Sequence, residues 1–312
     1  MPVLEGDCLE LLPGLGFAVD AVVCDPPYHL KATLKRFGQS GSAPAQWGRD
    51  GAMARLSSGF MGEAWDGGDI AFRPQTWAVI GAAMRPGAFL AAFGGTRTWH
   101  RLACAIEDGG LVIQDTLAWV YGSGFPKRRD QLKPAWEPIV LAYRPGGPRA
   151  LQIEECRACG RWPANLIHDG SPEVIDLFPE TLPARAGRRG IQGRYDPGGG
   201  PEVKRWKPGS DYQRGHDDSG GSAARYFPNI RFFYCPKASK AERAGSTHAT
   251  VKPVALIEWL VRLVTPPGGI VLDPFAGSGT TGLAAMRAGR AAILIERDPR
   301  WVADIHQRLE AA

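Results

Sequence analysis

Residues 270–282 read I-V-L-D-P-F-A-G-S-G-T-T-G, an apolar run that ends in an acid and continues into a glycine-rich turn. Gly277, Gly279 and Gly282 fit the pattern G-x-G-x-x-G between an expected strand and an expected helix. Glycines let the backbone approach a ligand closely, and Glu296, at the end of the next expected strand, can accept hydrogen bonds from ribose hydroxyls. The stretch therefore predicts a nucleoside-binding loop in an α/β fold.

This loop leaves two cofactors open. No lysine follows Gly279, as it would in a P-loop, so triphosphate binding is not expected. NAD carries a ribose, an adenine and a pyrophosphate, whereas S-adenosylmethionine carries the ribose and the adenine without the pyrophosphate. The glycine loop and the acid fit both cofactors equally well, so the choice depends on a second motif.

The second motif is D-P-P-Y at 25–28, which follows the run V-D-A-V-V-C at 19–24. Ligands of open α/β sheets bind beyond the carboxyl ends of the strands, where Asp25 is expected. Each proline fixes its own φ and lacks an N–H, and the residue before a proline is held extended, so Pro26–Pro27 is a stiff corner. The carboxylate and a carbonyl of this corner can accept both hydrogens of one amino group, while Tyr28 offers a ring for stacking. Such acceptors would stabilise positive charge that develops on an amine as it attacks a methyl group.

Two blocks of the chain, up to about residue 145 and again from about 254, alternate short apolar runs with helix-length segments. The expected strands are Ala18–Cys24, Ala88–Phe93, Gln114–Tyr121, Pro138–Tyr143, Ile270–Asp273 and Ala291–Glu296. The expected helices are Pro74–Met84, Thr98–Glu107, Val254–Val264, Thr280–Ala288 and Pro299–Leu309. Strands rich in Val, Ile and Ala that alternate with helices predict a parallel sheet covered on both faces.

The region between the blocks, 146–245, is rich in Gly, Pro, Arg and Trp and is too long for an ordinary loop. Its segment 185–214 holds eight basic residues against three acidic ones, a surplus equal to the formal net charge of +5 for the whole chain. The basic residues are Arg185, Arg188, Arg189, Arg194, Lys204, Arg205, Lys207 and Arg214. A local basic surplus suggests contact with a polyanion, and a solvated insertion is the alternative. A second insertion, 31–68, follows Tyr28.

The bulk composition is that of a soluble globular protein, because 44% of the 312 residues are hydrophobic and 22% are charged. No apolar run approaches the roughly 20 residues of a membrane span. The six cysteines are scattered, which suits a reducing cytoplasm, so we expect a cytoplasmic protein without a membrane segment. Cys156 and Cys159 form C-x-x-C with His168 beyond, but no fourth ligand follows at a familiar spacing, so no metal is expected.

Taken together, D-P-P-Y at 25–28 and D-P-F-A-G-S-G-T at 273–280 resemble the motifs of the DNA amino-methyltransferases. The order, with the catalytic tetrapeptide first and the cofactor loop last, resembles their β class, a circular permutation of the usual methyltransferase order. G-D-C at 6–8 is similar to the adenine-contacting segment of that family, and H-A-T-V-K-P at 248–253 to the segment before its cofactor loop. F-Y-C-P-K-A-S-K at 233–240 resembles a stretch of its phage-associated members.

The resemblance implies a Rossmann-like methyltransferase sheet with helices on both faces, circularly permuted. It divides the chain into a catalytic half at 1–145, a target recognition region at 146–245 and a cofactor-binding half at 246–312. It implies transfer of a methyl group from S-adenosylmethionine to N6 of a flipped adenine in double-stranded DNA. In that family Asp at the first motif position usually accompanies adenine N6, and Ser accompanies cytosine N4. N4-cytosine methylation therefore stays as an alternative for Asp25, and a homodimer and a separate restriction endonuclease are compatible partners.

Two other classes of protein explain fewer features. A nicotinamide-dependent oxidoreductase would use the glycine loop but would leave D-P-P-Y without a role. A non-catalytic DNA-binding protein would not need both motifs intact.

Site residues follow from the resemblance motif by motif. The predicted catalytic residues are Asp25, Pro26, Pro27 and Tyr28. The predicted cofactor-binding residues are Asp7, Cys8, Asp25, Lys252, Asp273, Phe275, Ala276, Gly277, Ser278, Gly279, Thr280 and Glu296. The predicted DNA contacts are the eight basic residues of the segment 185–214 given above.

Overall fold

The computed structural model describes residues 1–28, 69–122, 132–133, 135–148, 150–183, 219–229 and 251–312. It also describes the backbone of two short strands, β3 (Gln46–Trp47) and β4 (Met53–Ala54), which pair antiparallel with each other. All eight predicted DNA contacts and the stretch 233–240 lie outside the described residues, as does most of the insertion at 31–68.

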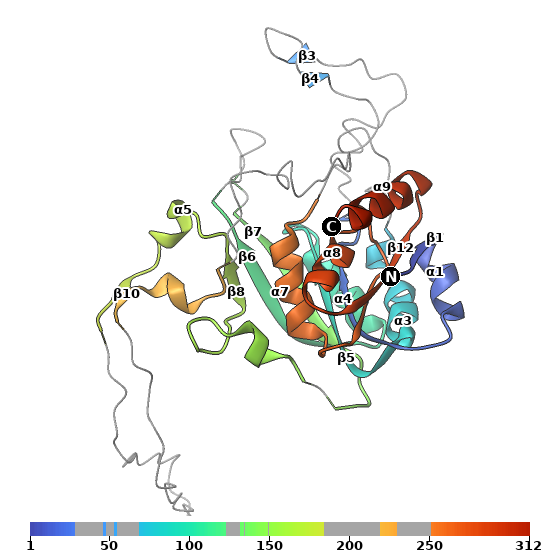
Figure 1. Cartoon of the computed structure of the whole chain (residues 1–312), viewed down its shortest axis with the longest axis horizontal. Coiled ribbons are helices and arrows are strands. Elements are labelled where there is room, and N and C mark those ends of the chain that lie inside the picture. Colours follow the sequence, from blue (N-terminus) through green and yellow to red (C-terminus); the bar gives the residue numbers. More distant parts are fainter. Residues whose placement is uncertain are drawn as a thin grey trace, which may run out of the picture.

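One eight-stranded sheet organises the molecule, in the order β1-β12-β11-β2-β5-β7-β6-β8. Figure 1 shows the sheet between the helices. Its strands are β1 (Val3–Glu5), β2 (Val19–Cys24), β5 (Met84–Phe93), β6 (Val112–Val120), β7 (Trp136–Tyr143), β8 (Leu166–His168), β11 (Ile270–Asp273) and β12 (Ala291–Glu296). Every strand expected from the sequence belongs to this sheet, whereas the short strands β1 and β8 were not predicted.

Helices cover both faces of the sheet, as predicted. The α-helices are α1 (Cys8–Leu11), α3 (Pro74–Ala83), α4 (Trp99–Asp108), α5 (Pro172–Ile175), α7 (Val254–Val264), α8 (Thr280–Arg287) and α9 (Pro299–Glu310). The 3-10 helices are η1 (Leu12–Gly14), η3 (Ile70–Phe72), η4 (Ile153–Cys156) and η5 (Ala223–Tyr226). Among the described residues, no helix is long and apolar enough to cross a membrane.

Two apolar cores lie on opposite faces because successive side chains of a strand point to opposite sides. Along β2, Ala21 and Val23 pack with α7 and α8, whereas Val22 and Cys24 pack with α3 and α4. The central strands are therefore buried on both faces, which explains why they read as continuous apolar runs rather than as alternating ones. The result is the three-layer α/β arrangement of the Rossmann-like class.

The predicted parallel sheet contains one antiparallel strand. β7 pairs antiparallel with both β5 and β6, and the other strand pairs of the sheet are parallel. A parallel return requires a crossover connection, usually a helix, and the sequence between β6 and β7 carries no helical pattern. The chain therefore turns back from β6 into β7, which reverses the direction of that strand.

The adjacent strands β11 and β2 mark the point where the chain connections diverge. β11 leads through α8 toward β12, whereas β2 leads through α3 to β5 on its other side, and these helices lie on opposite faces. A crevice opens at the carboxyl ends of strands that diverge in this way, and ligands of open α/β sheets bind there. The two motifs of the sequence, which begin at Asp273 and Asp25, follow directly on these two strands.

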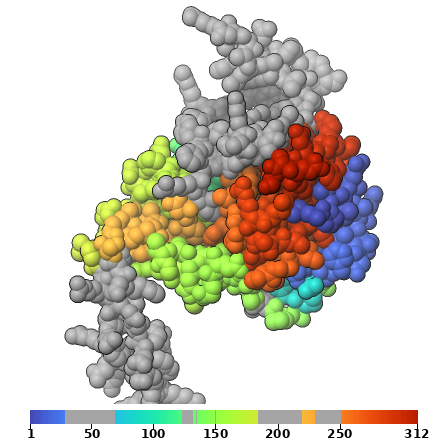
Figure 2. All heavy atoms as spheres, in the orientation of Figure 1, coloured from blue at the N-terminus to red at the C-terminus, as the bar shows by residue number. Residues whose placement is uncertain are grey.

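The region predicted for target recognition contributes a strand to the main sheet. β8 pairs parallel with β6 at the edge of the sheet, and His168 of β8 forms a bridge with Asn229, which follows η5 in the chain. Nearby, β9 (Glu180–Thr181) and β10 (Gly221–Ser222) form a small antiparallel pair. These elements lie at the end of the molecule away from β1 and α1 (Figures 1 and 2).

Candidate active site

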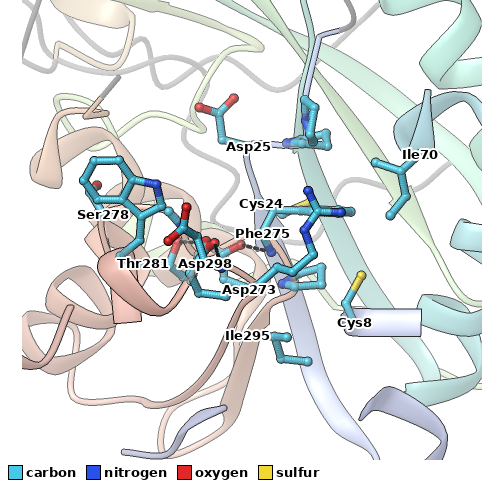
Figure 3. A pocket seen from close by; sticks show the side chains of 18 of the residues that line it. Cys8, Cys24, Asp25, Ile70, Asp273, Phe275, Ser278, Thr281, Ile295 and Asp298 are labelled. Atoms are coloured by element: carbon cyan, nitrogen blue, oxygen red, sulfur yellow. Dashed lines mark hydrogen bonds between the residues drawn. The ribbon is translucent and has the colours of Figure 1, made fainter. Parts of the chain in front are cut away.

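A pocket of about 930 Å³ lies at the carboxyl ends of β2 and β11 (Figure 3). The D-P-P-Y corner and the glycine loop both line it, although they are about 250 residues apart in the sequence. All the predicted catalytic residues and all the predicted cofactor-binding residues except Gly279 are among its lining residues. The structure therefore brings together two motifs that the sequence could only place on separate strands.

Carboxylates hold the glycine loop from both sides. Asp273 accepts hydrogen bonds from the Phe275 amide at 3.0 Å and from the Thr281 hydroxyl at 2.6 Å. Glu296 accepts from the Gly277 amide at 2.8 Å through Oε2 and from the Asp298 amide at 2.8 Å through Oε1. Each carboxylate oxygen has a second lone pair, so Glu296 can also accept a hydrogen bond from a ligand in the pocket.

Gly279 packs against Ile305 of α9 and does not line the pocket. It is the N-cap of α8 with φ +75°, in the left-handed region, and an added Cβ would lie 2.9 Å from the buried side chain of Ile305. Arg308 of α9 is also buried there and donates a hydrogen bond to the Ser278 carbonyl. The close contact between the loop and α9 thus requires glycine at position 279.

The segment after β1 forms another wall of the pocket. Asp7 is the N-cap of α1 and accepts a hydrogen bond from the Leu9 amide at 2.9 Å. Burial, reinforced by the nearby Asp7 carboxylate, raises the pKa of the Cys8 thiol to about 12, so Cys8 lines the pocket as a neutral group. The sequence predicted both residues as cofactor contacts, and both border the space beside the glycine loop.

The D-P-P-Y corner is held by a lysine and by a glutamate that sequence reasoning missed. The Lys252 ammonium lies 2.9 Å from Asp25 Oδ2, 3.1 Å from Glu137 Oε2 and 3.0 Å from the Tyr28 hydroxyl. The backbone carbonyl of Tyr28 accepts a hydrogen bond from Thr98 Oγ1 at 3.3 Å. The corner is thus anchored by side chains from three other parts of the chain.

The second oxygen of Asp25 lacks a hydrogen-bond donor in the described part of the structure. Asp25 Oδ1 is buried and has no hydrogen-bond partner among the described residues. A buried acceptor without a donor costs about 1–3 kcal/mol, so native proteins rarely keep one without a use. An amino group that entered the pocket could satisfy this oxygen.

The pocket is more acidic than basic. Seven of its lining residues are Asp or Glu and four are Lys or Arg. Burial, the largest cause, and neighbouring carboxylates raise the pKa of Asp273 and Glu296, although hydrogen bonds to backbone amides oppose the shift. The surplus of carboxylates favours a ligand that carries positive charge.

Arg73, Arg300 and Trp301 also line the pocket and were not predicted. They carry no motif, and only the fold brings η3–α3 and the start of α9 to the same edge of the sheet.

Among the described residues no cluster of three or more His, Cys, Asp or Glu side chains could hold a metal ion. The ring nitrogens of His168 face the Ala224 carbonyl and the Gly170 amide, so its side chain serves the local structure.

Because burial raises the pKa of the Asp273 carboxyl, we expect the stability of the protein to depend on pH. Burial raises this pKa from 3.8 to about 7, so the contribution of the carboxyl to stability is complete below about pH 4 and is lost as the pH rises through 7. Since each pKa unit corresponds to about 1.4 kcal/mol, the free energy of unfolding of the wild type should fall relative to that of Asp273→Asn between about pH 4 and pH 7. Urea unfolding at several pH values measures this difference. The exposed Asp108→Asn should show no such trend, and a constant difference for Asp273→Asn would contradict the assignment.

Comparison with known proteins agrees with this geometry. The family model N6_N4_Mtase, described as DNA methylase, matches residues 19–307, and the chain belongs to this DNA methylase family. A curated relative, the type II methyltransferase M2.DpnII of Streptococcus pneumoniae, is 42% identical over 72 residues, which are 23% of this chain and 27% of the relative. The match therefore spans little more than a quarter of the length of this relative, and the match to a second curated relative covers 28% of that protein.

Solved structures share the fold over nearly the whole chain. The complex of M1.HpyAVI with SAM is 17% identical with a TM-score of 0.51, covering 99% of this chain and 98% of that one. The PvuII DNA methyltransferase, described as cytosine-N4-specific, is 18% identical with a TM-score of 0.53, covering 98% and 85%. At these identities the likeness establishes the Rossmann-like methyltransferase fold and leaves the substrate to the chemistry of the site.

Proposed function

We propose that this chain is a DNA methyltransferase that transfers a methyl group from S-adenosylmethionine to the exocyclic amino group of a base. The observation that carries the proposal is the shared pocket, which is lined both by the glycine loop and by Asp25, whose Oδ1 has no hydrogen-bond partner among the described residues. An amine bound at Asp25 and a nucleoside bound at the loop would therefore meet. The family membership and the SAM complex of the structural neighbour support the same function.

The residues of the loop fit a sulfonium cofactor better than a dinucleotide. A pyrophosphate needs free backbone amides in the glycine loop and at the start of the helix, but the Gly277 amide of the loop already donates to Glu296 at 2.8 Å. A carboxylate at that place repels a pyrophosphate and attracts a cation. The acidic surplus of the pocket lining acts in the same direction, so the alternative of a nicotinamide-dependent oxidoreductase is disfavoured.

Asp7, Cys8, Phe275, Gly277 and Glu296 would hold the cofactor along its nucleoside. Glu296 would accept a hydrogen bond from a ribose hydroxyl, and the Phe275 side chain and the Cys8 thiol offer apolar surface. When bound, S-adenosylmethionine supplies an electrophilic methyl group on a sulfonium centre.

The D-P-P-Y corner would orient the amine. Asp25 Oδ1 would accept one amino hydrogen, and the stiff Pro26–Pro27 backbone would present a carbonyl for the second. Two acceptors aimed at one nitrogen stabilise the positive charge that develops on it, and the Tyr28 ring would stack on the base. A base in a duplex cannot reach such a pocket, so the target would be flipped out of the helix.

We propose adenine N6 as the target because the first position of the motif is Asp25 and not serine. This choice rests on the resemblance to the family, in which that residue accompanies adenine. The cytosine-N4-specific neighbour has the same fold, so the fold is compatible with either base.

The remaining sequence predictions belong to this proposal. The circularly permuted β-class order and the boundaries at 145 and 245 stay predictions, as does the phage-associated type. The eight basic residues of 185–214 remain the proposed DNA contacts, which would position the duplex through its phosphates. A homodimer and a companion endonuclease are compatible with the proposal.

Mass spectrometry of methylated DNA tests the proposed function. Duplex DNA that contains many sequence contexts is incubated with the protein and isotopically labelled S-adenosylmethionine, and is then digested to nucleosides. Labelled N6-methyladenine is the expected product. N4-methylcytosine alone would overturn the choice of base, and the absence of label in every nucleoside, together with tight binding of NAD in calorimetry, would overturn the function.

A further inference from the structure

The Lys252 ammonium contacts three groups. They are the Asp25 carboxylate after β2, the Glu137 carboxylate on β7 and the Tyr28 hydroxyl. The distances are 2.9 Å to Asp25 Oδ2, 3.1 Å to Glu137 Oε2 and 3.0 Å to the Tyr28 hydroxyl. The ammonium also lies 4.8 Å from the centroid of the Phe93 ring, which excludes water on that side.

This arrangement uses the hydrogen-bonding capacity of the lysine completely. An ammonium group has three N–H donors, and three protein acceptors are in reach of it. Lys252 therefore has no donor left for a cofactor in this arrangement, although the sequence predicted it as a cofactor contact. Its contacts make it a support for the acid at position 25, and its role as a cofactor contact stays a prediction.

The cluster around Lys252 contains two acidic side chains, Asp25 and Glu137, and one basic side chain. Burial alone would lower the pKa of Lys252, but the carboxylates of Asp25 and Glu137 outweigh it and raise the pKa, so the lysine stays protonated. Burial and then the same two carboxylates raise the pKa of Tyr28, so its hydroxyl stays neutral. Two carboxylates that share one ammonium leave the cluster with a net negative charge beside the place where an amine would bind.

Glu137 shares the Lys252 ammonium with Asp25 and also accepts a hydrogen bond from the Tyr28 hydroxyl at 3.4 Å. With Glu137 present, the ammonium is shared and engages Asp25 through Oδ2 alone. Without the charge of Glu137, the ammonium would be drawn fully to Asp25 and could reach Oδ1, the oxygen that has no partner among the described residues. That oxygen would then be a weaker acceptor for an incoming amine.

We propose that Glu137 is a positioning residue, which acts through Lys252 to keep Asp25 Oδ1 negatively charged and aimed at the target amino group. The proposal rests on the proposed function, because it assigns a role to Glu137 in that same reaction. Glu137 lines the pocket, but the role proposed for it is exerted through Lys252 and Asp25 and needs no direct contact with the base or the cofactor. The cluster would carry the negative charge that complements the developing positive charge on the amine.

Glu137→Gln tests the proposal, with Glu107→Gln at an exposed position of α4 as the matched control. We expect kcat to fall about 10- to 100-fold, because small displacements of a catalytic group carry losses of this size. KM for both substrates and the dissociation constant of S-adenosylmethionine should stay within a few-fold of wild type, since no contact to either ligand is removed. Single-turnover rates, normalised to the fraction of protein that binds the cofactor, measure the effect. A kcat equal to that of the control would overturn the proposal, as would a loss confined to KM.

A double-mutant cycle with Lys252→Met tests whether Glu137 acts through the lysine. If it does, Glu137→Gln should change kcat little in the Lys252→Met background, whereas fully multiplicative losses would overturn the proposal. If Glu137→Gln fails to fold, Glu137→Asp carries the test, because its shorter side chain withdraws the carboxylate from Lys252. A lower kcat with unchanged KM supports the proposal in that variant, and the wild-type kcat contradicts it.

Failure of this proposal is distinguishable from failure of the proposed function. Wild-type protein that methylates DNA, together with a fully active Glu137→Gln, rejects only the role of Glu137. Wild-type protein that methylates no nucleoside rejects the function itself, and with it the role of Glu137.

Discussion

Asp25→Ala is expected to lower kcat for methyl transfer by about 10³-fold, the size of effect seen when one group that stabilises transition-state charge is removed. The carboxylate supplies Oδ1, the buried acceptor without a partner among the described residues, and alanine leaves the amine with no acceptor there. Alanine also releases the Lys252 ammonium from its 2.9 Å contact, so positive charge would face the nitrogen on which positive charge must develop. Initial-rate measurements with labelled cofactor and saturating duplex DNA give the effect.

The matched control for this prediction is Asp108→Ala, which makes the same substitution at an exposed position at the end of α4. It should keep wild-type rates. Thermal unfolding and cofactor binding of Asp25→Ala check that the folded pocket persists. Methyl transfer by Asp25→Ala at the wild-type rate would refute the assignment of this residue, whatever the fold.

Gly279→Ala is expected to destabilise the protein by about 2–5 kcal/mol and to weaken cofactor binding with it. The residue has φ +75°, which costs an alanine energy, and its Cβ would lie 2.9 Å from Ile305, which is completely buried. Relief of this contact requires the glycine loop or α9 to shift. A shift of the loop would disturb the hydrogen bond between Gly277 and Glu296.

Gly14→Ala is the matched control, because Gly14 lies outside the left-handed region and a Cβ added there would meet nothing within 4 Å among the described residues. Chemical unfolding with and without S-adenosylmethionine measures both parts of the prediction. We expect a lower midpoint for Gly279→Ala and a smaller stabilisation by the cofactor. Equal stability of Gly279→Ala and Gly14→Ala would show that the loop tolerates a side chain there.

The sequence predicted the central sheet closely because its strands are buried on both faces. Ile270–Asp273 and Ala291–Glu296 have the predicted bounds, since each is a short apolar run between turn signals. The helix Val254–Val264 also has the predicted bounds. The three-residue strand β1 was not predicted, because so short a run has no periodicity. It forms because its backbone pairs with β12, which is a tertiary interaction.

Glu137 shows why part of the site could not be predicted. A parallel β7 would have placed its first residues at the edge of the sheet opposite to Asp25. Because β7 is antiparallel to β5, with Phe93 beside Ile139, its beginning lies at the edge where β2 ends. The acid in the unremarkable run Trp136–Tyr143 thus reaches the D-P-P-Y corner only through the reversal of one strand.

Lys252 illustrates the opposite case, in which a motif marked a residue whose role depends on its neighbours. The resemblance placed it among the cofactor contacts, and the structure places it in the pocket lining. Its three donors, however, are directed at protein acceptors. Sequence alone shows that a lysine is near the site and cannot show which groups its ammonium meets.

The decisive experiment is a structure of the protein with duplex DNA and a non-reactive analogue of S-adenosylmethionine. We expect an extruded base whose exocyclic nitrogen lies within hydrogen-bond distance, about 3 Å, of Asp25 Oδ1, in the same pocket as an analogue bound on the loop at Gly277. A base or an analogue bound in a different cavity, with the Asp25 carboxylate remote from the amine, would contradict this expectation.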